Sequence, residues 1–197
     1  MLLINNLHKP NQIKTTVMKK TSLFLALALS TGALFAQKKT TTSASVNFDA
    51  TTSTDALPKA ENKTAIAALD TKTGDVAFEV QIKNFSFGNP MMQEHFNSNG
   101  WLDSDKFPTA NFKGKINNLS EVNFSKDGTY NVDIVGDMTI HGVTNPVKTK
   151  AVITVAGKKI SSKSDFSIKL EDYKVEGKAI AAGKVATEPT ISVTADF

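Results

Sequence analysis

The chain has 197 residues, 40% of them hydrophobic, and it contains no cysteine, which excludes disulfide bonds and thiolate catalysis. All 23 basic residues are lysines, and four of them lie in residues 1–36, where no acidic residue occurs, so the remainder carries 19 lysines against 19 Asp and Glu. A remainder with zero net charge and no arginine argues against a nucleic-acid-binding protein.

Residues 1–36 are predicted to be an N-terminal extension followed by a signal peptide. Met18-Lys19-Lys20 precedes an uncharged run rich in Leu and Ala, which ends at Ala36. A basic segment, an apolar segment and a small residue before the cut are typical of secretory signals. We therefore expect cleavage after Ala36, a translation start at Met18, and a periplasmic or secreted protein. The apolar run is too short for a stable membrane span, which needs ~20 residues.

The remaining chain is predicted to form one domain over residues 45–197, preceded by a flexible lead-in over residues 37–44, a Lys/Thr/Ser tract without apolar periodicity. Alternation of apolar and polar residues indicates strands that each have one dry face. A strand end or a β-bulge is expected near Asn84, where the apolar phase shifts by one residue. In chain order, the predicted strands cover residues 46–50, 66–69, 76–83, 110–116, 130–140, 147–155, 160–170 and 191–197.

The two runs on either side of His141-Gly142 form the longest alternating stretch, from Tyr130 to Val155. They predict a long antiparallel hairpin with one polar and one apolar face. The His141 ring is expected to hydrogen-bond across the turn, which is a structural role.

Residues 88–108 interrupt the strand pattern. Asn89-Pro90 is suited to start a helix, so a short helix through residues 91–96, or a loop segment, is expected near residues 90–100, followed by a loop with aromatic anchors. The segment holds apolar side chains outside regular strands, which suits a flap or plug over one end of a barrel.

About eight strands at this spacing predict an all-β fold, namely an antiparallel lipocalin-like barrel. A barrel of this size is either filled by its own side chains or holds one small ligand. Small residues such as Gly114, Gly136 and Ser164 fall in phase with large ones on the inward face, and they favour neither interpretation over the other.

Catalytic and metal-binding motifs are absent from the sequence. His95 and His141 have no second His or Cys at metal-ligand spacing, and no nucleophile elbow, P-loop or dinucleotide fingerprint occurs. We therefore expect a protein that is not an enzyme and that needs no metal or cofactor.

Three segments carry a resemblance to a known family. Residues 136–147, GDMTIHGVTNPV, closely resemble the "G-x-L-T-h-H-G-V-T-x-P-V" hairpin of the YceI-like family. Residues 94–96 and 105–112 resemble its histidine-containing segment, and residues 165–168 with 172–173 resemble its late strand and turn. The chain departs from the family pattern at residues 91–94, where the family often has an Arg-Asp pair, and in its first strand, which lacks the usual histidine.

The resemblance implies an exported, extended barrel that binds a long apolar chain, such as a polyisoprenoid or fatty-acyl lipid, for transport, storage or stress protection. The alternatives are a packed barrel that acts through protein partners and, ranked lower, an enzyme that acts on a bound lipid. A homodimer is left open. Ligand-binding residues are expected in the apolar lumen and at its mouth. The lumen set is Phe78, Val80, Ile82, Phe112, Met138, Ile140, Phe166 and Ile168, and the mouth set is Met91, Met92, Phe96 and Trp101.

Overall fold

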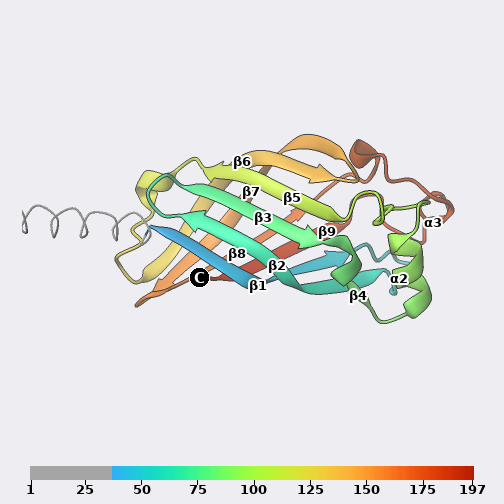
Figure 1. The fold of residues 1–197 in the computed structure, drawn as a ribbon, viewed down its shortest axis with the longest axis horizontal. Coiled ribbons are helices and arrows are strands. Elements are labelled where there is room, and N and C mark those ends of the chain that lie inside the picture. Colours follow the sequence, from blue (N-terminus) through green and yellow to red (C-terminus); the bar gives the residue numbers. More distant parts are fainter. Residues whose placement is uncertain (1–36) are drawn as a thin grey trace, which may run out of the picture. The chain divides into compact units, whose positions relative to one another are not determined.

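The computed structural model describes residues 37–197, which form a closed β-barrel (Figure 1). Eight strands make one antiparallel sheet, and pairing of the first strand with the second closes it. A ninth, two-residue strand, β4, pairs with the second strand outside the ring. The predicted leader over residues 1–36 lies outside the described residues. The barrel strands are β1 (Lys38–Asp49), β2 (Lys59–Asp70), β3 (Asp75–Gln81), β5 (Thr109–Ile116), β6 (Gly128–Ile140), β7 (Val143–Ala156), β8 (Lys159–Ser167) and β9 (Thr190–Asp196).

The predicted hairpin is the pair β6–β7, whose ladder runs without a shift from Gly128↔Val155 to Ile140↔Val143. Its two-residue turn is His141-Gly142, with φ of 51° and 73°. Positive φ at both positions defines the type I′ turn, whose twist matches that of the flanking strands. Histidine is among the residues that tolerate this region, so the sequence suits its turn.

The predicted flexible lead-in over residues 37–44 differs from the structure. Residues Lys38 to Thr41 continue β1 and pair with the end of β2, from Lys38↔Asp70 to Thr41↔Ala67. The prediction was wrong because strand pairing is made by backbone N–H and C=O groups. Polar side chains do not prevent these groups from forming hydrogen bonds. The register then shifts between Thr41 and Val46, which marks an irregular stretch in this pair.

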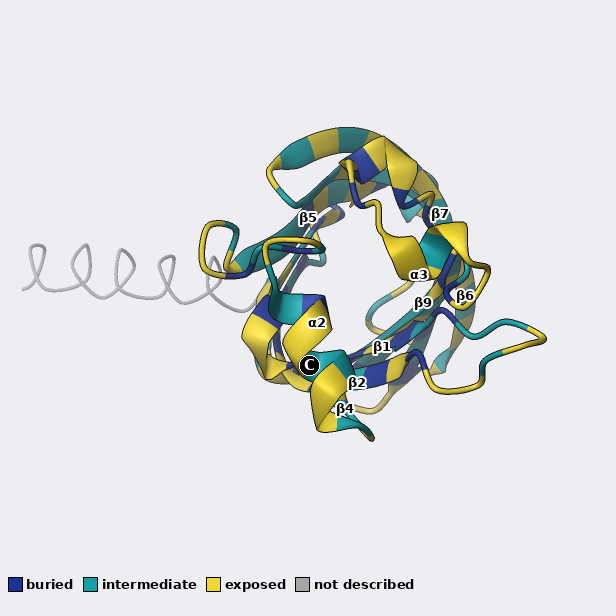
Figure 2. Ribbon diagram, turned by 90° about the vertical axis from the view of Figure 1, so that its right-hand side faces the viewer, coloured by how far each residue is buried: buried dark blue, intermediate teal, exposed yellow. Residues whose placement is uncertain are grey.

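Apart from residues 117–127 at the opposite end, the long connections gather at one end of the barrel, which we call the mouth. They are residues 50–58, 82–108 and 168–189, and the last two carry the short helices α2 (Pro90–Asn97) and α3 (Lys178–Ala181). Figure 2 looks onto this end, with α2 and α3 on opposite sides of the ring of strands. Within residues 37–197, no helix is long and apolar enough to cross a membrane.

The predicted short helix is α2, and the predicted strand end near Asn84 is confirmed. β3 stops at Gln81, and a single 3₁₀ turn, η1 (Ile82–Asn84), follows it. The Asn89 side chain accepts a hydrogen bond from the Met91 N–H at 2.9 Å, which caps α2. The connection between β8 and β9 holds η3 (Glu171–Tyr173) and α3.

The barrel wall is not evenly paired. β7 pairs with β6 along its whole length but with β8 only over residues 151–156, so the two strands separate beyond the pair Ala151↔Ser164. The mouth-side half of β7 contacts η3 instead, where the Asn145 side-chain N–H donates to the Asp172 carbonyl at 2.7 Å. We call the unpaired stretch between β7 and β8 the seam.

Candidate binding cavity

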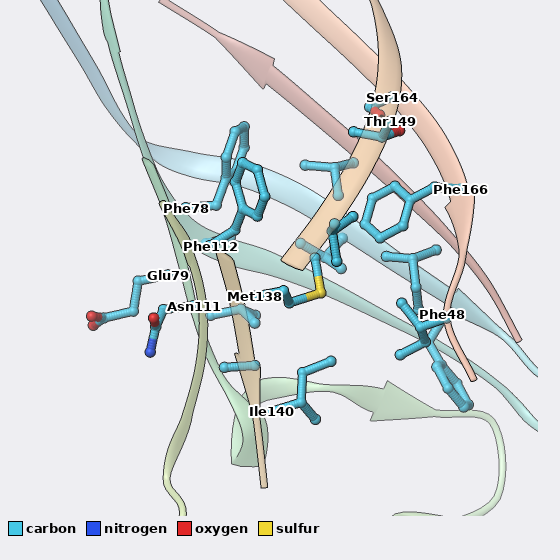
Figure 3. Close-up of a pocket in the computed structure, with 18 of the residues that line it drawn as sticks. Phe48, Phe78, Glu79, Asn111, Phe112, Met138, Ile140, Thr149, Ser164 and Phe166 are labelled. Carbon is cyan, nitrogen blue, oxygen red and sulfur yellow. Dashed lines mark hydrogen bonds between the residues drawn. The ribbon is translucent and has the colours of Figure 1, made fainter. Parts of the chain in front are cut away.

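An apolar cavity lies inside the barrel (Figure 3). Its volume is about 160 Å³, counted as the space open to the centre of a water molecule. Since a single water needs roughly 10–15 Å³ on this measure, the cavity has room for on the order of ten groups of that size. All eight barrel strands contribute lining residues, and most of the lining residues are apolar. The barrel is therefore not filled by its own side chains.

All eight residues predicted for the lumen line this cavity. Phe112, Ile82 and Ile168 are buried, whereas Phe78, Val80, Met138, Ile140 and Phe166 are only half-buried. These five side chains point inward and line the cavity. The part of their surface that other side chains do not cover therefore faces the lumen. The alternation pattern thus identified the inward face correctly, and binding of a ligand by these residues stays a prediction.

Two glycines shape the wall beside Phe112. Gly114 and Gly136 are paired directly across β5 and β6. A Cβ on Gly114 would lie 2.5 Å from Cζ of Phe112, and one on Gly136 would lie 2.7 Å from the same atom. Neither position has space for a methyl group, so the glycine pair lets the aromatic ring lie close to the backbone.

An aromatic cluster lies where the cavity meets the mouth. Phe96 of α2 is 3% exposed, and its ring packs against Phe48, Phe85, Phe87 and Trp101 with centroid distances of 4.9–5.6 Å. Tilted and edge-to-face contacts of this kind stabilise aromatic pairs beyond their buried area. Both Phe96 and Trp101 line the cavity, as expected for mouth residues.

The other two residues expected at the mouth do not line the cavity. Met91 is 64% exposed, and Met92, one turn before Phe96, is half-buried but outside the lining. Met91 is on the solvent side of α2, and Met92, although on the same face as Phe96, lies one turn nearer the start of the helix, beyond the edge of the lining. Met91 and Met92 therefore have no place in the cavity wall.

Several lining residues were not singled out as ligand-binding positions. Leu170 is in the predicted strand over residues 160–170 but lies beyond the observed end of β8, and Val175 comes from the same connection between β8 and β9. Thr149 lines the cavity on β7, and Ser162 and Ser164 line it on β8. A signal for Thr149 was present in the sequence, since it is in phase with Val147 and Ala151 on the apolar face of its strand.

The two histidines of residues 37–197 do not lie in the cavity wall. His95 is exposed on α2. The His141 ring does not hydrogen-bond across its turn, and that expectation was wrong. Its Nδ1 lies 3.2 Å from the Tyr173 carbonyl oxygen, and the ring packs edge-on against Phe107 at 4.8 Å. His141 thus ties the hairpin turn to η3. Within residues 37–197, no group of three or more His, Cys, Asp or Glu is placed to hold a metal ion.

Charged groups lie on the outer face of the barrel. Seven ion pairs connect exposed side chains of the described region, among them Lys150–Asp133 at 3.4 Å and Lys163–Asp165 at 3.2 Å. A hydrogen bond from the Ser192 hydroxyl holds the pKa of Asp165 below its ordinary value. At the mouth, burial raises the pKa of Tyr173, and neighbouring Asp172 adds to the effect.

Comparison with known proteins matches the chain to one family. The YceI-like domain pattern matches residues 27–197. Over 89 residues the chain is 35% identical to a UPF0312 protein of Pseudomonas fluorescens, an alignment that covers 44% of each chain. Over another 89-residue alignment it is 30% identical to protein YceI of Escherichia coli, covering 42% of each chain. The chain thus spans less than half the length of these two relatives.

Solved structures share the fold. A polyisoprenoid binding domain from Saccharophagus degradans, implicated in plant cell wall breakdown, superimposes with a TM-score of 0.68 at 12% identity, covering 81% of this chain and 97% of that one. BcnA of Burkholderia cenocepacia superimposes with a TM-score of 0.65 at 18% identity, covering 78% and 96% of the two chains. At these identities the likeness concerns the fold.

Proposed function

This chain belongs to the YceI-like domain family, and we propose that its barrel binds an amphipathic, isoprenoid-like lipid with the apolar chain inside the lumen. The observation that carries the proposal is the unfilled apolar cavity, whose half-buried side chains face the lumen. A well-packed interior leaves few voids larger than a water molecule, so a cavity of this size inside a closed barrel favours a guest. The shared fold with a polyisoprenoid binding domain supports the same class of ligand.

Apolar burial would supply most of the affinity. Each CH₂ group removed from water contributes about 0.8 kcal/mol, so ten carbon atoms contribute on the order of 8 kcal/mol before the cost of association. We therefore expect affinity to rise with chain length until the chain fills the lumen.

The role is proposed to be binding, for transport, storage or stress protection, and not catalysis. Both histidines of the described region lie outside the cavity lining, and the acidic side chain in that lining, Glu79, points away from the lumen in Figure 3. Residues that face the lumen are thus unsuited to proton transfer. A packed barrel that acts through partners is less well supported, because the lumen is not packed.

Export to the periplasm or the medium is part of the proposal and rests on the sequence of residues 1–36. Fractionation of the native host and N-terminal sequencing of the mature protein test it. The expected first residue is Gln37. Recovery of the protein from the cytoplasm with its leader intact would contradict export and leave the binding proposal standing.

Lipid binding is tested in two ways. Protein purified from its native host is extracted with organic solvent, and the extract is analysed by mass spectrometry for isoprenoid-type lipids. Lipid-free protein is then titrated with isoprenoid alcohols of increasing length. Trp101 is the one tryptophan of the chain and lines the cavity, so its fluorescence reports occupancy.

A matched pair of variants shows whether the lumen is the site. Val193 lines the cavity, whereas Val152 faces outward and is 39% exposed. Val193→Phe should weaken binding at least tenfold because the larger ring occupies the lumen, whereas Val152→Phe should leave binding unchanged. An empty extract together with no saturable fluorescence change would overturn the proposal.

A further inference from the structure

A polar site interrupts the apolar lining of the lumen. Thr149 of β7 and Ser164 of β8 both line the cavity, and their hydroxyl oxygens lie 3.0 Å apart (Figure 3). Ser162 lies two residues before Ser164 on the same face of β8 and also lines the cavity. The Thr149 and Ser164 hydroxyls together are called the hydroxyl cluster.

The hydroxyl cluster lies at the point where the barrel wall separates. Ala151↔Ser164 is the last pair between β7 and β8, and Thr149 lies beyond it, at the start of the seam. The Ser164 hydroxyl donates to the Lys150 carbonyl at 2.8 Å. Side-chain hydrogen bonding thus continues where the backbone ladder stops, and it holds two hydroxyls inside an otherwise apolar space.

The cluster has no charged neighbour in the lumen. The two charged residues of the cavity lining are Glu79 and Lys163. Glu79 points away from the lumen in Figure 3, and the Lys163 ammonium pairs on the outside with Asp165 at 3.2 Å. An ionised group buried here would have no counter-charge, which is strongly unfavourable, whereas a neutral polar group needs only a hydrogen bond.

The hydrogens of the paired hydroxyls are already used within the protein. Ser164 donates to the Lys150 carbonyl, and Thr149 donates either to the Ser164 oxygen or, at 3.3 Å, to the same carbonyl. Each hydroxyl has one hydrogen to donate and two lone pairs that can accept. Since both hydrogens are used, the two hydroxyls can only accept a further hydrogen bond. The group that fits is therefore a hydrogen-bond donor without charge.

We propose that Thr149 and Ser164 accept a hydrogen bond from the hydroxyl group of a lipid alcohol, so that the polar end of the ligand lies beside the seam. The inference rests on the proposed lipid-binding function and narrows it from isoprenoid-like lipids in general to neutral alcohols. The apolar chain then runs from the hydroxyl cluster past Met138 and Ile140 toward the aromatic cluster at the mouth.

The test compares two ligands that differ in one hydrogen-bond donor, namely farnesol and its methyl ether. Dissociation constants are measured by Trp101 fluorescence for the wild-type protein and for a Thr149→Val, Ser164→Ala double variant. The matched control is Thr154→Val, Ser161→Ala, because Thr154 and Ser161 are paired across the same two strands on the outward face. Circular dichroism and thermal unfolding show whether each variant is folded.

In the wild-type protein and the control, farnesol should bind about five- to tenfold more tightly than its ether, the range expected for one or two buried hydrogen bonds. In the double variant the preference should disappear or reverse, because the alcohol then buries an unpaired hydroxyl.

Equal affinities of the wild-type protein for the two ligands would overturn the inference and leave the proposed function standing. So would a double variant that is less stable but keeps the preference, since the hydroxyls would then only close the seam. If neither ligand binds to the wild-type protein, both the inference and the proposed function fail.

Discussion

The ring of Phe112 lies so close to the backbone of Gly136, on the neighbouring strand, that a Cβ at Gly136 would come within 2.7 Å of its Cζ atom. The same Cβ would also collide with the Lys113 carbonyl oxygen and the Gly114 Cα, which belong to the opposite strand. A ring can move, but paired backbone atoms cannot move without loss of the ladder. The width of the lumen at this level therefore depends on the absence of a side chain at Gly136.

Gly136→Ala should accordingly destabilise the protein by about 1–3 kcal/mol, the usual cost of overpacking, and should push the Phe112 ring into the lumen. We expect lower lipid affinity as well as a lower midpoint of denaturation, measured by fluorescence titration and urea unfolding. Gly88→Ala is the matched control, because a Cβ there has nothing within 4 Å. Wild-type stability in Gly136→Ala would show that the strands can separate to admit a methyl group.

Phe96 should be the main anchor of α2. Phe96→Ala removes a ring that is 3% exposed and that packs against four other aromatic side chains, so we expect a loss of about 3–5 kcal/mol. Loosening of the mouth should also speed release of a bound lipid, measured by stopped-flow fluorescence. Met91→Ala on the same helix should change the free energy of unfolding by no more than about 0.5 kcal/mol, because Met91 is 64% exposed. A large effect of Met91→Ala would contradict the placement of α2.

His141 should stabilise the fold through its ring and its tolerance of a positive φ. His141→Ala loses the contact with the Tyr173 carbonyl and the packing against Phe107, and alanine is disfavoured at φ 51°, so we expect a loss of about 1–3 kcal/mol. His141→Asn should lose less, because asparagine tolerates this backbone conformation. Chemical denaturation measures both losses, and equal losses would show that the ring contacts alone matter.

Tyr173 should make stability depend on pH in the alkaline range. Burial raises the pKa of Tyr173 above its ordinary value of 10.0, so folding favours the neutral phenol. The stability that this group contributes is fully present below pH 10 and is lost as pH rises through the raised pKa of the folded state.

Tyr173→Phe should therefore flatten the fall of the melting temperature above pH 10. Tyr130→Phe serves as the control, since Tyr130 is half-buried and its hydroxyl donates to the Lys126 carbonyl at 2.9 Å in a solvent-exposed hydrogen bond. Relative to its own melting temperature at neutral pH, each variant should behave differently only above pH 10, where Tyr130→Phe keeps the fall and Tyr173→Phe reduces it. Identical melting curves for both across this range would show that ionisation of Tyr173 does not limit stability.

The inward face of the barrel followed from alternation alone, because neighbouring residues of a strand point to opposite sides whatever the register of pairing. Phe78, Phe112 and Phe166 come from different parts of the chain, yet all three were assigned to the lumen and all three line it. The helix at Pro90–Asn97 was likewise predictable from a local cap, Asn89-Pro90.

The sequence by itself thus determined which side chains point inward and which turn joins the longest hairpin, because both depend on near neighbours in the chain. Only the tertiary structure decided that residues 38–41 take part in the pairing that closes the barrel and that the lumen remains unfilled. It also decided that Met91 faces solvent and that Thr149 meets Ser164 where β7 and β8 separate. These features depend on the pairing of distant strands and on how side chains from several strands share one interior, which no local pattern encodes.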